Sequence, residues 1–344
     1  MRAVWVEDWT PFENLTLKEV PVPQIGPRQV RIKTQAAGVS FATSLVVEGK
    51  YQRKPPRPFA PGTEVAGIVT EIGSDVTKFK LGDRVCSILD WGGLAEEAAA
   101  NEVNTFHIPD ALPYPEAISF TNSYGTSIAS LTWPHLLNVQ KDDWLLIHGA
   151  AGGVGIAAVE IGKILGATVI ATASSAEKLD LVRAHGADHA INYRDRDFRE
   201  AVLEITNGRG VDKVYDPVGG DVFMQSLRCM APEGRICPVG FAGGTIQQIP
   251  ANILLVKNLT VCGVNMGYYA GWSPDDVRYQ YEDRIRGLMN QLFDWFEAGQ
   301  IKPVSGGVYP LDRFQDAMAD VLGRKSLGRV AVVMHEEATK HGFG

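Results

Sequence analysis

A glycine-rich turn between an apolar run and a helix constrains the fold of this 344-residue chain more than any other segment. The run Trp144–His148 is followed by Gly149–Gly155, which reads GAAGGVG, and then by a helical pattern over Val154–Leu165. A second apolar run, Thr168–Ala173, comes next. This order predicts a strand, a tight turn, a helix and a second strand, which together make a βαβ unit.

The turn has the form A-x-G-x-x-G, which is typical of dinucleotide binding. Ala150 stands where the backbone turns, Gly152 where the chain approaches a pyrophosphate, and Gly155 where the helix packs on the strand. The first amides of the helix would then face an anion. Such a turn can also serve tight packing alone, but the strand before it and the helix and strand after it favour cofactor binding.

Strands and helices continue to alternate through the middle of the chain, which predicts a parallel sheet. Further strands are expected at residues 190–192, 211–215, 235–239 and 259–264, and helices at 176–185, 197–206 and 222–230. The first third shows short alternating β patterns broken by Pro and Gly. The tail carries two amphipathic helices near residues 285–296 and 314–322 and a closing strand at 328–334. Residues 336–344 are polar, and we expect them to be frayed.

Composition limits the kinds of partner that the protein can bind and the cellular compartment in which we expect it. The length predicts two domains, and a net charge of −7 argues against nucleic acid or an anionic membrane surface as a partner. Cys86, Cys229, Cys237 and Cys262 form no C-x-x-C pair and no zinc-finger spacing, which favours a reducing compartment. We find no signal-peptide pattern and no apolar run long enough for a membrane span, so we expect a cytoplasmic protein.

The end of the second strand predicts the cofactor. A carboxylate that holds the adenosine ribose is expected there, but Ala173 is followed by Ser174 and Ser175, and Lys178 lies one helical turn later. Hydroxyls and an ammonium suit a 2′-phosphate, which favours NADPH over NADH. In the alternative interpretation, Ser175 is only a helix cap and Lys178 a solvated helix residue.

Motifs along nearly the whole chain resemble the medium-chain dehydrogenase/reductase superfamily, in particular its zinc-free quinone oxidoreductase branch. The segments that carry the resemblance are Lys18–Pro23 (KEVPVP), Gly26–Val30 (GPRQV), Ala37–Ser40 (AGVS), Pro61–Gly67 (PGTEVAG), Leu81–Val85 (LGDRV), Gly149–Gly155, Gly186–Asp188 (GAD) and Asp216–Gly220 (DPVGG).

The resemblance implies an α/β fold with two domains. A GroES-like β-domain of residues 1–122 and 263–344 would be the catalytic domain, and residues 123–262 an inserted Rossmann domain with a doubly wound parallel sheet. The apolar strand 259–264 would lie at the edge of this sheet and pair with its twin in a homodimer.

The resemblance also implies that no metal is bound. Ser40 and Thr63 stand where zinc members of the superfamily carry cysteine and histidine, and neither is a good zinc ligand. We expect the neighbouring Glu64 to be a buried, hydrogen-bonded carboxylate. Without a Lewis acid to hold an alkoxide, reduction of a conjugated acceptor is favoured over alcohol dehydrogenation.

The same resemblance assigns roles to individual positions. The residues expected to hold the pyrophosphate are Gly152, Gly153, Val154 and Gly155, and those expected around the 2′-phosphate are Ser174, Lys178, Tyr193 and Arg324. The residues expected near the nicotinamide are Val218, Val239, Gly240, Phe241, Val264 and Asn265. The acceptor pocket is expected to contain Ser40, Tyr51 and Thr126. Simpler interpretations remain open, with Tyr193 as an exposed aromatic, Arg324 as a helix-end charge and Tyr51 as a packing residue. His148, at a strand end, is expected to be a packed core residue.

The sequence thus predicts an NADPH-dependent, zinc-independent reductase that transfers hydride to quinones. The nearest alternative is reduction of the double bond of enals or enones by the same hydride chemistry. Another is a non-catalytic NADPH-binding protein of the crystallin kind. The physiological acceptor, the choice of one- or two-electron reduction and the proton donor stay open.

Overall fold

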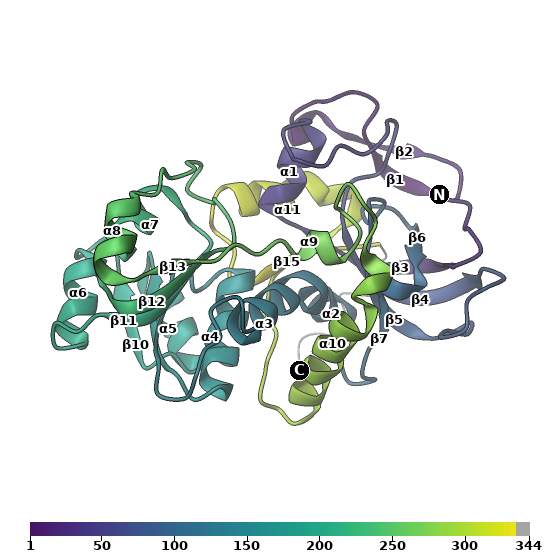
Figure 1. Cartoon of the computed structure of the whole chain (residues 1–344). Coiled ribbons are helices and arrows are strands. Elements are labelled where there is room, and N and C mark those ends of the chain that lie inside the picture. Colours follow the sequence, from purple (N-terminus) through teal and green to yellow (C-terminus); the bar gives the residue numbers. More distant parts are fainter. Residues whose placement is uncertain (335–344) are drawn as a thin grey trace. The chain divides into compact units, whose positions relative to one another are not determined.

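The structure is a computed structural model that describes residues 1–334 and divides the chain into two compact units (Figure 1). Unit 1 contains Met1–Asn122, Met266–Glu297 and the chain from Pro303 onward, and unit 2 contains Ser123–Asn265 and Ala298–Lys302. The end at 336–344, which we expect to be frayed, lies outside the described residues.

Unit 1 is built around the long strand β3 (Gln29–Val39), which has neighbours on both edges. One edge pairs with β4 (Glu64–Ile72), and the other is shared by β6 (Glu97–Asn101) and β15 (Arg329–Val333), all antiparallel to β3. Its remaining elements are β1 (Arg2–Trp5), η1 (Phe12–Asn14), β2 (Thr16–Glu19), α1 (Phe41–Val47), β5 (Arg84–Ile88), η2 (Glu102–Asn104), β7 (Thr105–His107), α2 (Tyr114–Ser119), α9 (Met266–Tyr269), η4 (Arg278–Gln280), α10 (Glu282–Glu297), β14 (Ser305–Pro310), η5 (Leu311–Arg313) and α11 (Phe314–Leu322).

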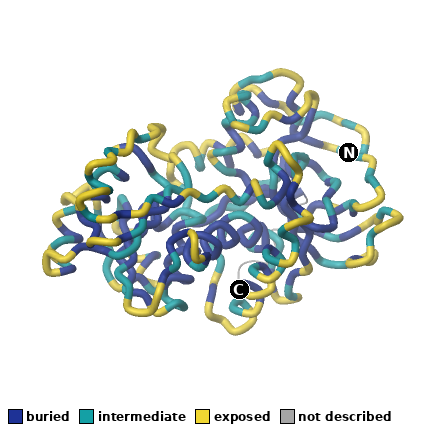
Figure 2. The backbone as a smooth tube through the Cα atoms, viewed as in Figure 1, coloured by how far each residue is buried: buried dark blue, intermediate teal, exposed yellow. Residues whose placement is uncertain are grey.

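Alternation of side chains along β3 explains how unit 1 forms its core. Val30 and Ile32 are buried while Arg31 and Lys33 are less so, because successive residues of a strand point to opposite faces. The buried side chains join those of β4, β15 and α11 in one apolar cluster. Figure 2 marks these strand interiors as buried and the turns between them as mostly exposed.

Unit 2 contains a parallel sheet with the strand order β10-β9-β8-β11-β12-β13. The strand order reverses between β8 and β11, which are neighbours in the sheet. From β8 the chain proceeds through β9 to β10 at one edge, and from β11 through β12 to β13 at the other edge. The bounds are α3 (Gly125–Thr132), β8 (Trp144–Ile147), α4 (Gly153–Ile164), β9 (Thr168–Ala173), α5 (Ala176–Ala184), β10 (His189–Asn192), α6 (Phe198–Ile205), β11 (Val211–Asp216), α7 (Gly220–Ser226), β12 (Met230–Pro238), α8 (Ala251–Lys257) and β13 (Thr260–Val261). A π turn, η3 (Phe120–Tyr124), precedes α3.

Helices cover both faces of this sheet, so the expected doubly wound α/β fold is confirmed. On one face, a Cβ on Gly162 of α4 would contact Leu145 and Val169. On the other face, Leu146 and Ile170 pack with residues of α6 and α7. Both faces being buried explains why the strands read as continuous apolar runs.

Three parts of unit 2 differ from the sequence prediction. The helix expected at 222–230 is α7 (Gly220–Ser226), and the strand expected at 235–239 begins already at Met230. The strand expected at 259–264 is reduced to Thr260–Val261, because its partner β12 ends at Pro238, which has no N–H to continue the ladder. The short helix α8 was not predicted: its side chains are half-buried or exposed, so it has no clear apolar periodicity.

Candidate active site

The glycine turn adopts a backbone that only glycine tolerates well, but at a different residue from the expected one. Gly149 has φ of +54°, in the left-handed region, and it lies two residues after the end of β8. Ala150, which we expected where the backbone turns, is instead buried, and its N–H donates to the carbonyl of Thr172 on β9. The tight turn therefore belongs to Gly149, and Ala150 anchors it to the neighbouring strand.

The two following glycines meet different surroundings. A Cβ on Gly155 would lie 2.4 Å from the Gly149 carbonyl oxygen and 2.6 Å from Ala150 Cα, so the helix can approach the turn only without a side chain there. A Cβ on Gly152, the N-cap of α4, would meet only the Gly149 oxygen at 3.3 Å. Protein packing thus requires glycine at 155, whereas the space beside Gly152 leaves the first amides of α4 open to an anion.

The loop after β11 lies beside this turn, at the point where the strand order reverses. A Cβ on Gly149 would contact Pro217 Cγ at 3.3 Å and Val218 Cγ2 at 3.7 Å. Asp216 ends β11 and is fully buried, and its Oδ1 accepts hydrogen bonds from the amides of Val218 (2.8 Å) and Gly219 (3.1 Å). Ligands of open parallel sheets bind at such a reversal point.

Backbone hydrogen bonds join the loop after β11 to the loop after β12. Val239 N–H donates to the Asp216 carbonyl (2.8 Å), Ala242 N–H to the Pro217 carbonyl (3.0 Å) and Gly243 N–H to the Val218 carbonyl (2.9 Å). Gly240 and Phe241 lie between these anchored positions. The structure therefore brings the candidates Val218, Val239, Gly240 and Phe241 together at the carboxyl ends of adjacent strands, while Val264 and Asn265 follow β13, the next strand of the sheet.

The candidate 2′-phosphate residues of unit 2 gather at the ends of β9 and β10. Tyr193 N–H donates to the Ala173 carbonyl at 3.2 Å, which places Tyr193 beside Ser174, and the Tyr193 side chain is 48% exposed. Ser175 is the N-cap of α5, and its Oγ accepts a hydrogen bond from the Lys178 amide at 3.4 Å. The capping role considered for Ser175 is therefore real, and Lys178 lies one turn into the same helix.

Thr126 lies in α3 and is buried, and its surroundings tie that helix to the glycine-turn region. Its carbonyl accepts a hydrogen bond from Ser130 Oγ at 2.7 Å. The next residue, Ser127, donates to the Val154 carbonyl at 2.8 Å and lies 2.9 Å from the Tyr215 hydroxyl. These contacts fix α3 against the start of α4 and against β11.

Unit 1 contains Ser40, Tyr51 and Arg324. Ser40 is the N-cap of α1, and its Oγ lies 3.2 Å from Thr43 Oγ1. Tyr51 lies in the loop after α1, where its amide donates to the Leu45 carbonyl at 3.1 Å and burial raises the pKa of its hydroxyl. Arg324 follows α11 with φ of +55°.

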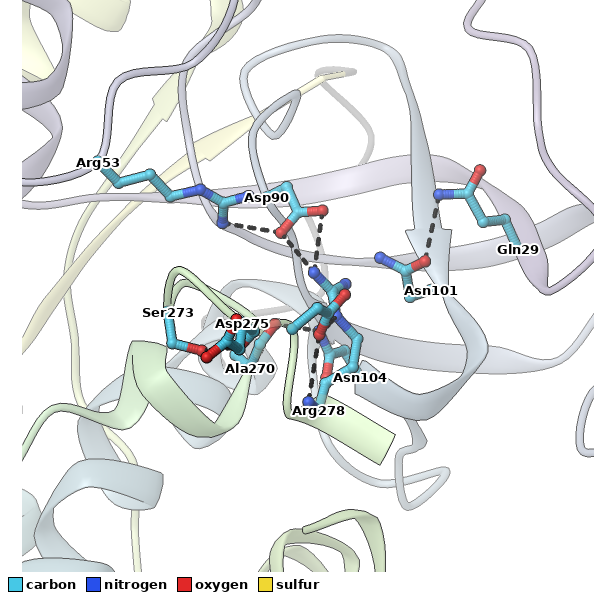
Figure 3. A network of polar contacts seen from close by, with 10 residues as sticks. Gln29, Arg53, Asp90, Asn101, Asn104, Ala270, Ser273, Asp275 and Arg278 are labelled. Carbon is cyan, nitrogen blue, oxygen red and sulfur yellow. Dashed lines mark hydrogen bonds and ion pairs between the residues drawn. The ribbon is translucent and has the colours of Figure 1, made fainter. Parts of the chain in front are cut away.

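A polar network that sequence reasoning missed fixes the loop of Tyr51 (Figure 3). Arg53, two residues after Tyr51, donates to Asp90 Oδ1 at 2.8 Å, and Arg278 donates to both Asp90 oxygens at 3.1 and 3.3 Å. The Arg53 guanidinium also lies 5.6 Å from the ring centre of Trp91 and 5.9 Å from that of Trp272. Cation–π contacts of this kind stabilise a partly buried guanidinium.

Glu64 is buried and fully engaged with protein groups, as expected. Its Oε1 accepts a hydrogen bond from Asn122 Nδ2 at 2.6 Å, and its Oε2 pairs with the Arg329 guanidinium. Sequence reasoning missed Arg329, although a lone cation at the start of an apolar closing strand was a usable signal. Within residues 1–334, His, Cys, Asp and Glu side chains do not form a group of three or more that could hold a metal ion.

His148 is a core residue, as expected. It is buried, and its ring nitrogens lie 3.0 Å from Thr172 Oγ1 and 2.8 Å from Ser226 Oγ. Burial lowers the pKa of His148 to about 3, which keeps the ring neutral.

Comparisons with known proteins agree with the fold. The model of an alcohol dehydrogenase GroES-like domain matches residues 26–110, and that of a zinc-binding dehydrogenase matches residues 153–280. A GroES-like domain combined with a Rossmann-like parallel sheet defines an oxidoreductase of the medium-chain dehydrogenase/reductase superfamily.

Individual relatives define the branch. Quinone oxidoreductase-like protein 2 of Rattus norvegicus is 38% identical over 92% of this chain and 88% of its own length. A quinone oxidoreductase of Pseudomonas aeruginosa is 31% identical over 93% of this chain and 96% of its own length. The chain therefore belongs to the quinone oxidoreductase branch of that superfamily, which confirms the resemblance.

Solved structures agree with this assignment. Escherichia coli quinone oxidoreductase, solved in complex with NADPH, has a TM-score of 0.86 and 28% identity, and covers 97% of this chain and 100% of its own. A mycobacterial protein in complex with NADPH has a TM-score of 0.87 at 30% identity, over 97% of this chain and 100% of its own. A 2-haloacrylate reductase has a TM-score of 0.81 at 31% identity, over the same shares. Among the described residues, we find no helix whose length and apolar character would allow it to cross a membrane.

Proposed function

We propose that this oxidoreductase is NADPH-dependent and zinc-independent and that it transfers hydride to quinones. The observation that carries the proposal is the open helix N-terminus beside Gly152. In addition, β9 is followed by Ser174, where a carboxylate would select NADH. Residues 1–122 and 263–344 would form the catalytic domain, and residues 123–262 the nucleotide-binding domain.

The phosphate groups of the cofactor fit the residues at this edge of the unit 2 sheet. The amides of Gly153, Val154 and Gly155 would hold the pyrophosphate, with Gly152 giving it room to approach. Ser174, Lys178 and Tyr193 would surround the 2′-phosphate, joined by Arg324. The hydrogen bond that places Tyr193 beside Ser174 supports this group.

The nicotinamide half of the cofactor fits the loops after β11, β12 and β13. Val218, Val239, Gly240 and Phe241 are held together by the backbone hydrogen bonds described above, and Val264 and Asn265 extend the same row of strand ends. A preorganised wall of this kind would orient the ring with little loss of freedom on binding.

When bound, NADPH supplies the hydride. Tyr51 would provide the proton that completes the hydroquinone, because a tyrosine hydroxyl is protonated at neutral pH; burial raises its pKa, which makes it a weak acid that depends on the reduced acceptor being the stronger base. Thr126 and Ser40 would contact the acceptor, although the Ser40 hydroxyl is also engaged with Thr43. The Asp90 network would hold Tyr51 in place through Arg53.

Zinc independence is supported by the chemistry of the residues at the positions where zinc members bind metal. Ser40 caps a helix, Thr63 offers a hydroxyl, and Glu64 already accepts hydrogen bonds from Asn122 and Arg329. A divalent zinc ion would need thiolate or imidazole ligands there.

Two alternatives are kept. The similarity to a 2-haloacrylate reductase favours the reduction of conjugated double bonds, in line with the enal or enone alternative. A non-catalytic NADPH-binding role would use the same cofactor residues without an acceptor.

We also propose a homodimer that pairs through the edge segment 259–264, and a cytoplasmic location.

The cofactor part is tested by fluorescence titration of the unaltered protein and of Lys178→Ala with NADPH and NADH. NADPH should bind more tightly than NADH, and the substitution should weaken NADPH binding about 10- to 100-fold, as expected for a charge-assisted hydrogen bond of roughly 1.5–3 kcal/mol. Lys141→Ala, which changes a lysine away from these strand ends, is the control. Equal affinities for the two cofactors in the unaltered protein would refute NADPH preference.

A further inference from the structure

Two cysteines lie side by side on neighbouring strands of the unit 2 sheet. The parallel ladder pairs Ile236 of β12 with Val261 of β13, and the Cys262 amide donates to the Ile236 carbonyl at 3.0 Å. The next pair in this register is Cys237 with Cys262. Directly paired residues of parallel strands point to the same face of a sheet, so the two thiols lie near each other, and the Cys262 thiol donates to the Ile236 carbonyl at 3.5 Å.

The two sulfurs differ in reactivity. Interaction with Cys262 and burial raise the pKa of Cys237, whereas interaction with Cys237 holds the pKa of Cys262 below its ordinary value. Cys237 is fully buried, and Cys262 retains 7% exposure. Cys262 is therefore the better nucleophile of the two once its thiol, which donates to the Ile236 carbonyl at 3.5 Å, loses its proton.

We propose that Cys237 and Cys262 are a redox modification site, which forms a reversible disulfide when the protein meets hydrogen peroxide. The Cys262 thiolate attacks one peroxide oxygen, breaks the O–O bond and becomes a sulfenic acid, and hydroxide leaves. The Cys237 thiol then displaces the sulfenic oxygen as water, and the S–S bond forms. In sum, two thiols are oxidised and one peroxide is reduced to two molecules of water.

The ladder geometry permits this bond but strains it. Neighbouring strands lie about 4.8 Å apart, which suits the Cα separation of a disulfide, but its Cβ atoms need to be only about 3.5–4.5 Å apart. The strand ends must therefore move together. Within one chain only two residues of β13 pair with β12, so β13 can move, and in the proposed homodimer the paired segment 259–264 would move with it. A strained disulfide is readily reduced, as a reversible site in a reducing compartment requires.

Oxidation would reach the proposed cofactor site, and this part of the inference rests on the proposed function. Val239 and Val264, both assigned to the nicotinamide half, follow Cys237 and Cys262 by two residues. Drawing the strand ends together shifts both loops. We expect the affinity for NADPH to fall roughly tenfold in the oxidised protein.

The test treats the full-length protein with hydrogen peroxide, counts its thiols and maps its peptides by mass spectrometry under non-reducing conditions. The four free thiols should fall to two, and a peptide that links Cys237 to Cys262 should appear and disappear again with dithiothreitol. The link should be absent from Cys262→Ser and from Cys237→Ser. It should persist in Cys229→Ala, because Cys229 lies outside the proposed pair and burial raises the pKa of its thiol to about 12.

This mapping needs no cofactor, so its result is independent of the proposed function. Four unreacted thiols, or oxidation of Cys86 or Cys229 in place of the linked pair, would overturn the site. NADPH titration of the oxidised and reduced protein then tests the consequence. An unchanged affinity in protein that carries the mapped disulfide would overturn the coupling to the cofactor loops, while the disulfide itself would stand.

Discussion

At the residue scale, His148 illustrates how a polar side chain at a strand end is satisfied inside the protein. The Ser226 hydroxyl donates to the Val222 carbonyl, so its oxygen must accept from His148 Nε2–H. The other ring nitrogen, Nδ1, then accepts from the Thr172 hydroxyl. The network fits a single neutral tautomer and leaves no place for a second proton.

This arrangement predicts how stability depends on pH. Because burial lowers the pKa of His148 to about 3, the unfolded chain binds a proton below pH of about 6.5 that the folded chain does not. The contribution to stability is thus full above that pH and is lost as the pH falls, by up to about 1.4 kcal/mol per pH unit. Urea unfolding between pH 7 and 5 should give a shallower pH dependence for His148→Gln than for the unaltered protein. Parallel curves would contradict the assignment.

Single residues were predictable where chemistry and position coincide. Ser175 was considered as a cap and is one, and Glu64 was expected to be a buried, hydrogen-bonded carboxylate. The partner of Glu64 was not predictable, because Arg329 lies 265 residues away along the chain. The tight turn was expected at Ala150 but lies at Gly149, which has the left-handed backbone. Its position depends on the hydrogen bond from Ala150 to Thr172 on β9, and a pattern of neighbouring residues cannot predict this contact.

At the element scale, the glycine turn and α4 allow protein packing to be separated from ligand binding. Gly155→Val should destabilise the protein by several kcal/mol, because its Cβ would meet backbone atoms at 2.4 and 2.6 Å. Gly152→Val has an extended backbone, with φ of −82°, and only one close neighbour, so the protein should remain folded. Its side chain would fill the space beside the helix N-terminus.

We therefore expect Gly152→Val to unfold within about 1 kcal/mol of the unaltered protein but to bind NADPH at least about 100-fold more weakly. Denaturant unfolding and cofactor titration, performed on the same preparations, measure the two quantities. Normal NADPH binding by folded Gly152→Val would contradict the proposal that the pyrophosphate binds at this turn.

Elements with strong periodicity were predicted well. The strand Thr168–Ala173 and the helix Phe314–Leu322 have the expected bounds, because the strand is a continuous apolar run and the helix repeats its apolar residues at helical spacing. The short β13 and α8 were predicted poorly. The end of β13 is set by a proline on its neighbour, and α8 has exposed apolar side chains such as Leu255 and Val256.

At the scale of the whole molecule, the alternation of strands and helices was sufficient to predict the class of fold. Tyr51 was proposed as an acceptor residue only from the family resemblance, and the Asp90 and Arg278 side chains that support its loop could not be predicted, because they come from distant parts of the sequence. The hydrogen bonds from Arg53 and Arg278 to Asp90 form only when unit 1 is folded, so the order of residues along the chain does not predict them.

The proposed homodimer can be tested at the edge of the unit 2 sheet. The Cys262 amide faces β12, so the amide of the preceding residue, Val261, faces the open edge. Val261→Pro removes that donor and should convert a dimer into a monomer, while Val261→Thr, which keeps it, should not. Light scattering during size-exclusion chromatography measures both. A dimeric Val261→Pro with an unchanged dissociation constant would contradict pairing at this edge.

Steady-state NADPH oxidation with 1,4-benzoquinone tests the central claim most directly, after dialysis against a strong chelator and with a 2-alkenal assayed in parallel. We predict quinone turnover that survives the chelator, vanishes in Gly152→Val and is lowered but not abolished in Tyr51→Phe. Turnover of the alkenal alone would transfer the assignment to double-bond reduction. A folded protein that binds NADPH but reduces neither acceptor, or whose activity is lost with a stoichiometric zinc ion, would contradict the account.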